Sequence, residues 1–170
     1  MTFTRKKTSG EIRTERLSKQ GADTHLILAC LWPKKGENLG TAIRTCDAVG
    51  ATMAVPATAN ATKALHRGNT IGDRHSPYIL IDEPVLSWLY SMRASHRIVG
   101  VELAHNATPL ADLDCDSPTV VVVGHEVSGI PQEALPICHE VVEIPMQGVG
   151  NSLNVSVAAS LVLYKVKGWT

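Results

Sequence analysis

The sequence lacks the motifs of several common protein classes. Its four cysteines show no Cys-x-x-Cys spacing, so neither a disulfide framework nor a zinc site is expected. The N-terminus has no apolar signal-peptide core, and no apolar run approaches the length of a membrane span. There is no Gly-x-Ser-x-Gly elbow and no P-loop, and the histidines show no metal-ligand spacing. These absences predict a soluble, cytoplasmic protein with reduced thiols, no bound metal and no contact with a membrane.

Charge is balanced over the chain as a whole but not along it. The 170 residues include 16 Lys or Arg and 16 Asp or Glu, so overall charge does not attract the protein to nucleic acid. Residues 1–20, however, contain six Lys or Arg and only two Glu. We therefore predict a basic arm over residues 1–24 that contacts phosphate, with a solvated, frayed terminus as the alternative.

Strand and helix patterns alternate along most of the sequence, which predicts one α/β domain. The run Val120–Val123 is β-branched throughout, as expected for a parallel strand covered by helices on both faces. The polar segment 57–76 is predicted to be a mobile connection. Strands are predicted at 26–31, 52–55, 78–81, 97–101, 120–123 and 140–144, and helices at 38–49, 85–95, 131–135 and 152–166. The fold class is thus an open, mostly parallel sheet that binds ligands at the carboxyl ends of its strands.

The stretch 144–159 contains the most informative pattern. It reads as a strand, a glycine-containing loop and a helix that begins at Ser152, a favourable N-cap residue. Asn154 and Ser156 are polar residues in the first turn of an otherwise apolar helix. Because Asn and Ser lower helix propensity there, we expect a site that needs their hydrogen-bonding groups.

Two further segments contain candidate site residues. Asn38 can serve as a helix N-cap, and Arg44 follows six residues later among small or apolar neighbours, which is compatible with a pocket wall. Glu126 lies in a loop with glycine at both ends, where it either braces the loop or binds a ligand. His125 is adjacent, but a single loop histidine is usually only solvated.

Three blocks of sequence carry a family resemblance when they are taken together. They are residues 38–50 (NLGTAIRTCDAVG), 124–130 (GHEVSGI) and 144–159 (IPMQGVGNSLNVSVAA). In order and spacing they resemble the SpoU/TrmH family of SPOUT-class RNA 2′-O-ribose methyltransferases, from about Leu26 to about Lys167. The resemblance implies a methyltransferase domain over residues 25–170 with an α/β knot, in which the C-terminal segment threads into a trefoil.

The resemblance also implies a cofactor and a partner. S-adenosylmethionine would bind in a bent conformation among the knot loops, in a homodimer where Arg44 of one subunit serves the site of the other. The residues implied for cofactor binding are Leu103, Gly124, Ile144, Met146, Ser152 and Leu153. The polar catalytic positions are Arg44, Asn38, Glu126, Ser152 and Asn154. No metal is needed, because the sulfonium is already an activated methyl donor.

The implied reaction is methyl transfer to a ribose 2′-hydroxyl, which must lose its proton. Arg44 could hold the target phosphate or, once desolvated, take the proton itself; the first role suits the guanidinium fork better. Residues 38–50 and 152–157 look most like the TrmH branch, which methylates tRNA, so the implied substrate is tRNA with rRNA as the alternative. The chain lacks the helical extensions of better-known members, and this departure leaves the choice of RNA open. A non-catalytic, knotted RNA-binding module is a further alternative.

Overall fold

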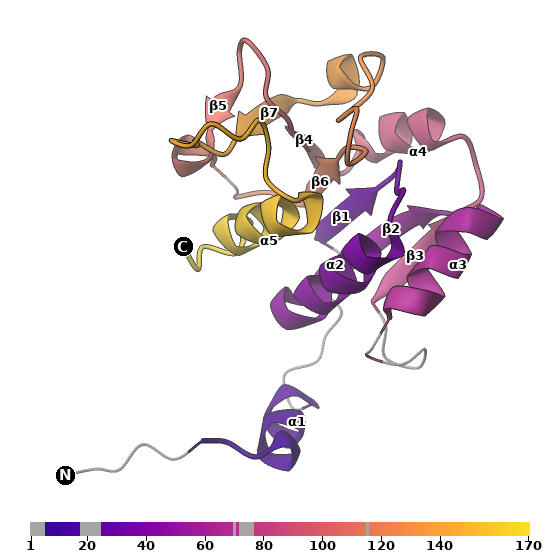
Figure 1. Cartoon of the computed structure of the whole chain (residues 1–170), viewed down its shortest axis with the longest axis vertical. Coiled ribbons are helices and arrows are strands. Elements are labelled where there is room, and N and C mark those ends of the chain that lie inside the picture. The colour runs from indigo at the N-terminus through magenta and orange to yellow at the C-terminus, as the bar shows by residue number, and fades with distance from the viewer. Residues whose placement is uncertain (1–5, 18–24, 70, 72–76, 115) are drawn as a thin grey trace.

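The computed structural model describes residues 6–17, 25–69, 71, 77–114 and 116–170. Seven strands within these ranges form one sheet in the order β3-β2-β1-β6-β4-β7-β5, and every pair of neighbours is parallel (Figure 1). The strands are β1 Leu26–Cys30, β2 Thr52–Pro56, β3 Tyr78–Ile81, β4 Arg97–Val101, β5 Thr108–Pro109, β6 Thr119–Val123 and β7 Glu140–Glu143. The predicted α/β class and parallel sheet are confirmed.

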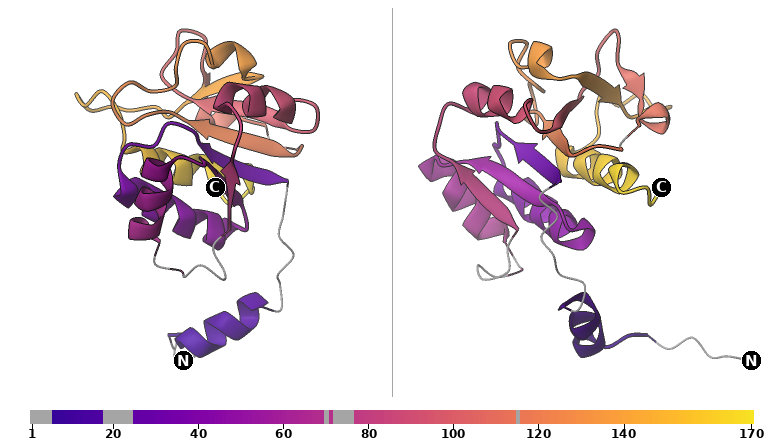
Figure 2. Two further views of the ribbon diagram at one scale, coloured as in Figure 1. Left: turned by 90° about the vertical axis from the view of Figure 1, so that its right-hand side faces the viewer. Right: turned by 180° about the vertical axis from the view of Figure 1, so that it is seen from behind.

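Helices cover both faces of the sheet, as predicted. On one face lie α2 Gly36–Val49, α3 Ala59–Gly68 and α5 Val155–Val166, and on the other lie α4 Val85–Met92 and the 3₁₀ turn η2 Leu135–Ile137. A second 3₁₀ turn, η1, spans Leu110–Asp112. Figure 2 shows these layers from two further sides. No helix in the described ranges is long and apolar enough to cross a membrane.

Strand β6 explains why the core has two halves. Val121 and Val123 pack into the cluster under α2 and α5, whereas Val120 and Val122 pack into the cluster under α4. All four valines are at most 3% exposed. Because successive side chains of a strand point to opposite faces, a β-branched run fills both layers at once.

The segment 57–76 was predicted to be a mobile connection, and this is wrong for its first half. Residues 59–68 form α3, whose N-cap residue Thr58 accepts a 3.2 Å hydrogen bond from the Ala61 backbone N–H. Ala61 and Leu65, four residues apart, are buried on one side of the helix. Two buried apolar residues are a weak signal, so the polar composition obscured the helix. Residues 70 and 72–76 lie outside the described ranges.

Other boundaries also differ from the prediction. Helix α5 begins at Val155 rather than Ser152, because the Asn154 side chain caps it by accepting from the Ser156 backbone N–H at 2.9 Å. Helix α2 begins two residues before Asn38, so Asn38 is not its N-cap residue. In place of the predicted helix 131–135, residues 132–134 form a turn and residue 135 begins η2. Strand β5 and η1 were not predicted. The trefoil knot stays a prediction that these pairings do not test.

Helices α2 and α3 approach each other unusually closely. A Cβ atom on Gly40 would lie 2.2 Å from the Gly68 carbonyl oxygen, and one on Gly36 would lie 2.8 Å from the Ala64 carbonyl oxygen. Glycine is therefore required at Gly40 by the neighbouring backbone. This contact fixes the start of α2 against the middle of α3.

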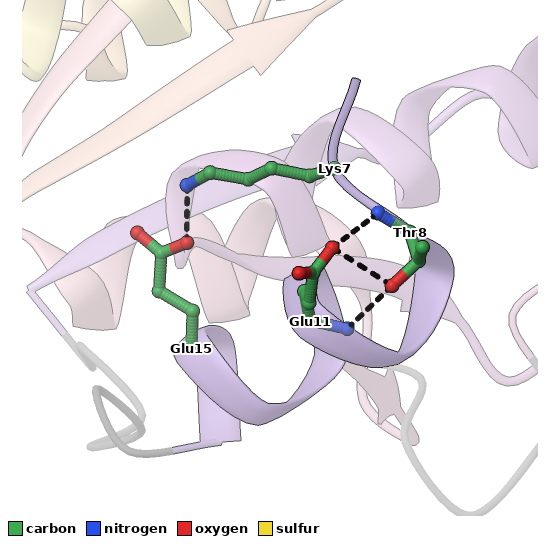
Figure 3. A network of polar contacts seen from close by, with 4 residues as sticks. All are labelled: Lys7, Thr8, Glu11 and Glu15. Atoms are coloured by element: carbon green, nitrogen blue, oxygen red, sulfur yellow. Dashed lines mark hydrogen bonds and ion pairs between the residues drawn. The ribbon is translucent and has the colours of Figure 1, made fainter. Parts of the chain in front are cut away.

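The N-terminal segment forms a helix, α1 Ser9–Leu17, which stands apart from the sheet (Figures 1 and 2). Thr8 and Glu11 form a capping box: Glu11 accepts from the Thr8 backbone N–H at 2.7 Å, and Thr8 Oγ1 accepts from the Glu11 N–H at 3.3 Å (Figure 3). Lys7 also pairs with Glu15. A frayed terminus is therefore wrong for residues 8–17.

Candidate active site

A cavity of about 500 Å³ opens at the carboxyl ends of β4, β6 and β7. Strand ends supply one wall, and the beginnings of α2 and α5 supply the other. It is lined by residues 35, 38, 101–103, 123–129, 142–144, 146, 151–155 and 158. The cavity thus lies where ligands bind in parallel α/β sheets, and its volume suits a small-molecule cofactor.

Nine of the ten site residues that the family resemblance implies line this one cavity. They are Asn38, Leu103, Gly124, Glu126, Ile144, Met146, Ser152, Leu153 and Asn154. These residues come from five separate parts of the chain. It is therefore the fold that brings them together, because most of them are far apart in the sequence. The tenth residue, Arg44, is not part of the lining.

A chain of hydrogen bonds joins the three sequence blocks. The Asn38 side-chain amide donates to Glu126 Oε1 at 2.9 Å, and the Asn154 amide donates to Asn38 Oδ1 at 3.0 Å. Asn154 Oδ1 in turn accepts from the Ser156 backbone N–H and, at 2.6 Å, from the Ser156 hydroxyl. We call Glu126, Asn38, Asn154 and Ser156 the polar relay. Its members come from the loop after β6, from α2 and from the start of α5.

Both ends of the polar relay fix the orientation of its amides. At one end, the Glu126 carboxylate also accepts from the backbone N–H groups of Lys34 and Lys35, at 3.1 and 2.9 Å. An ionised carboxylate can only accept, so Asn38 must present its NH₂ group to it. At the other end, a backbone N–H can only donate, so Asn154 must present its oxygen there. The relay therefore has one consistent direction.

These contacts change the acidity of Glu126. Partial burial raises its pKa, but the hydrogen bonds from the Asn38 amide and from the backbone together outweigh burial, so the pKa is lower than usual. Glu126 is thus held as an anion at neutral pH. It braces the glycine-flanked loop against the start of α2. Of the two roles predicted for Glu126, bracing the loop or binding a ligand, these contacts correspond to the first.

Arg44 does not line the cavity of its own chain. It is exposed on the outer side of α2, and Thr41 and Ala48 are exposed on the same stripe. Six helical residues turn through about 600°, which places Arg44 about 120° around the helix from Asn38. The two side chains therefore leave α2 in different directions. The Thr45 hydroxyl bonds that of Ser160 at 2.8 Å, which ties this part of α2 to α5.

Apolar side chains line the open side of the cavity. Leu103 is 52% exposed, Leu153 39% and Met146 37%, although all three border the same hollow. Exposed apolar groups around a cavity favour a ligand with a flat, largely apolar part. Backbone groups at Gly124 and Ile144 add hydrogen-bonding capacity, so an adenosyl cofactor fits the residues present.

Glu102 is a cavity residue that sequence reasoning missed. Its carboxylate accepts from the backbone N–H groups of Leu103 at 3.0 Å and of Ile130 at 2.7 Å. It also lies close to Gly129, where an added Cβ would be 2.1 Å from Glu102 Oε2 and where the φ of +69° favours glycine. Glu102 therefore joins the end of β4 to the loop after β6. No sequence motif marked it, because its partners are 1 and 28 residues away.

His125 braces the same loop. Its Nδ1 accepts from the backbone N–H groups of Val127 and Ser128, at 3.1 and 3.3 Å, and its own backbone pairs with that of Gly129. This role replaces the expectation of a merely solvated side chain. Within the described ranges, no three His, Cys, Asp or Glu side chains group as a metal site.

Residues 25–164 match the profile of a family described as the SpoU rRNA Methylase family. The tRNA (guanosine(18)-2′-O)-methyltransferase of Aquifex aeolicus is 35% identical over 136 residues. That alignment covers 79% of this chain but 64% of the relative. The chain therefore spans less than two thirds of the length of this relative.

Solved structures of SpoU methyltransferases resemble this fold. The A. aeolicus TrmH/SpoU tRNA modifying enzyme superposes with a TM-score of 0.74 at 26% identity, covering 94% of this chain and 82% of that chain. The SpoU methyltransferase AviRb from Streptomyces viridochromogenes, in complex with the cofactor AdoMet, gives a TM-score of 0.70 at 28% identity. That superposition covers 88% of this chain and 61% of AviRb.

Proposed function

The chain belongs to the SpoU rRNA methylase family, and from this premise we propose that it transfers a methyl group from S-adenosylmethionine to a ribose 2′-hydroxyl of RNA. We take tRNA as the substrate, because the Aquifex relative is named as a tRNA 2′-O-methyltransferase. rRNA is the alternative substrate.

The polar relay is the observation that carries this proposal. A structural loop brace would need only Glu126 and the backbone N–H groups of Lys34 and Lys35. The relay instead continues through Asn38 to Asn154 and keeps both amides at the edge of the cavity. Fixed amides at a cavity edge suit the orientation of a ribose hydroxyl. A catalytic site therefore accounts for the pattern better than an RNA-binding module without turnover.

The cavity residues divide into two roles. Leu103, Ile144, Met146 and Leu153 would enclose the adenosyl part of the cofactor, with Gly124 and Ser152 offering polar contacts. The bound cofactor supplies an electrophilic methyl group. Asn38 and Asn154 would orient the RNA ribose beside it, and the brace made by Glu126 and Glu102 holds the loop in place. Positioning of this kind supplies a large part of a catalytic rate.

Arg44 completes the site, in this proposal, from a second copy of the chain. Its exposed stripe on α2 lies beside α5, whose Val157 and Leu161 are 47% and 40% exposed. Apolar groups on a helix pair favour burial in a homodimer. The guanidinium of one subunit would then bind the target phosphate at the partner's cavity, so that the phosphate or a water accepts the hydroxyl proton. Direct proton transfer to a desolvated Arg44 is the alternative.

We further propose that residues 25–170 are the catalytic domain and that residues 1–24 are an arm that contacts RNA. Lys6 is exposed on this arm. The cytoplasm, where tRNA is modified, is the expected location.

The decisive experiment maps 2′-O-methyl sites in total tRNA and rRNA from cells with and without the protein. One nucleotide that loses its methyl group identifies the substrate, and its RNA decides between tRNA and rRNA. Purified protein should then methylate that RNA, and Arg44→Ala should lower kcat by about 10²-fold or more, as expected for a lost transition-state contact.

Calorimetry with S-adenosylmethionine provides the control. Arg44→Ala should bind the cofactor as the wild type does, because Arg44 does not line the cavity. Methyl transfer at the wild-type rate would contradict the role of Arg44. A wild-type protein that binds RNA but no cofactor would instead indicate the non-catalytic module.

A further inference from the structure

We infer that the outer face of α3, together with the residues just before α2, is an RNA-phosphate contact that flanks the active site. The contact consists of Lys34, Lys35, Lys63 and Arg67, which we call the α3 strip. The inference rests on the proposed function and adds to it a surface that holds the substrate.

Helix α3 contains basic residues and no acidic residue that would offset their charge. Its ten residues include Lys63, His66 and Arg67 and no Asp or Glu. Lys63 and Arg67 lie four residues apart, so they project from the same side of the helix. Both are exposed, and with Thr62 and His66 they line an open groove of about 650 Å³. The groove offers an extended, positively charged surface rather than a closed pocket.

The charged groups of the α3 strip are also unengaged within the described ranges. Among the residues that the structure describes, none makes an ion pair or a side-chain hydrogen bond with Lys34, Lys35, Lys63 or Arg67. Arg97, in contrast, pairs with Glu140. In a chain with zero net charge, four unengaged cations in one place make a local positive field. Two acids lie nearby, the exposed Glu37 and Glu126, which accepts from the backbone of Lys34 and Lys35, and they offset only part of this charge.

The close contact between α2 and α3 joins this field to the cavity. Gly36 lies against Ala64, and Lys35 and Lys63 are each one residue before that contact. Lys35 also lines the cavity. The α3 strip therefore begins at the cavity edge and continues along α3, on the side of α2 away from α5 (Figure 1).

RNA fits this surface better than an acidic protein does. The groove contributes few apolar side chains that could anchor a protein, whereas lysine and arginine contact phosphates of any sequence. A strand whose ribose enters the cavity must continue past its edge, and the α3 strip meets it there. The contact would add affinity without choosing the nucleotide.

The test compares Lys63→Gln/Arg67→Gln with a control pair of the same charge, Lys165→Gln/Lys167→Gln, near the end of α5. Binding of unmodified tRNA transcripts is measured by fluorescence anisotropy over a range of salt concentrations. The slope of log K against log salt is negative, and the loss of two phosphate contacts should make it less steep by about 1.4–1.8. Between about 50 and 200 mM salt, the fold-loss of affinity should then be about ten times smaller than in the wild type. The control pair should keep the wild-type slope. In methyl transfer, the α3 pair should raise KM for RNA and leave kcat unchanged.

The outcomes separate the inference from the proposed function. If the wild type binds and methylates RNA and the α3 pair keeps the wild-type slope and KM, only the inference is overturned. If the control pair flattens the slope as much as the α3 pair does, the effect comes from the overall charge of the protein and not from a local contact. The inference is then also overturned. If the wild type binds RNA, the slope falls only in the α3 pair, and no methyl is transferred, then the α3 strip stands and the proposed catalysis fails.

Discussion

Asn38 donates a 2.9 Å hydrogen bond to Glu126, although the two residues are 88 positions apart in the sequence. The bond connects the first turn of α2 to the loop after β6. Since Asn38 also accepts from Asn154, one amide holds together the three sequence blocks around the cavity. Disturbing this residue should therefore affect folding and the site together.

Asn38→Asp should destabilise the protein in a pH-dependent way. The substitution keeps the shape but places a second carboxylate against Glu126, where the wild type has a donor. We expect a loss of about 1–3 kcal/mol in the free energy of unfolding at pH 7. Because the paired carboxylates raise each other's pKa, the loss should shrink as the pH falls and one of them binds a proton. Urea unfolding at pH 7 and pH 5 measures this. Asn38→Ala, which adds no charge, should show a similar loss at both pH values; equal stability of Asn38→Asp and wild type at pH 7 would contradict the relay.

Glu126→Gln should remove a stabilisation that depends on ionised Glu126. The folded state lowers the pKa of Glu126 below the ordinary value of 4.5. The stabilisation is therefore fully present above about pH 5 and disappears as the pH falls through the lowered value. The stability difference between wild type and Glu126→Gln should be constant from pH 8 to about pH 5 and then decrease. Chemical unfolding across this range measures it, and a difference that grows in acid would show that the folded state raises the pKa instead.

The sequence predicted the location of this site better than the hydrogen bonds within it. The valines of β6 and the glycine loops placed a ligand site at the carboxyl ends of the strands, and the cavity lies there. The partners of Asn38 could not be predicted, because they lie 88 and 116 residues away and depend on the strand order of the sheet. Similarly, Ser152 and Asn154 are both good caps, and only the bond to Ser156 shows that Asn154 caps α5.

Gly40→Ala should destabilise the fold, although alanine favours helices. The added Cβ would lie 2.2 Å from the Gly68 carbonyl oxygen, and a backbone atom cannot rotate away as a side chain can. The expected cost is about 1–3 kcal/mol, which outweighs the gain of about 1 kcal/mol in helix propensity. Thermal unfolding measures the change. Gly10→Ala on α1 is the matched control, because its Cβ meets nothing within 4 Å, and it should cause no loss of stability. A gain at both positions would argue against the close contact of α2 and α3.

Deletion of residues 1–20 should weaken RNA binding and reduce its salt dependence. The arm contains six Lys or Arg, of which Lys7 is already paired with Glu15 on α1. If the others contact phosphates, each lost contact lowers the slope of log K against log salt by about 0.7–0.9. Filter binding of tRNA at several salt concentrations measures the slope. A slope equal to that of the full chain would show that the arm has no role in RNA binding.

Heterodimers test whether Arg44 acts across the subunit boundary. Arg44→Ala and Asn154→Ala should each inactivate a homodimer, because every site then lacks one group. In a heterodimer purified through two different tags, one site would lack both groups and the other would be intact, provided that Arg44 serves the partner's cavity. The purified heterodimer should therefore recover about half of the wild-type activity. If Arg44 served its own chain, both sites would lack one group and no activity would return. Because Arg44 lies about 120° around α2 from Asn38 and does not line the cavity of its own chain, we expect recovery.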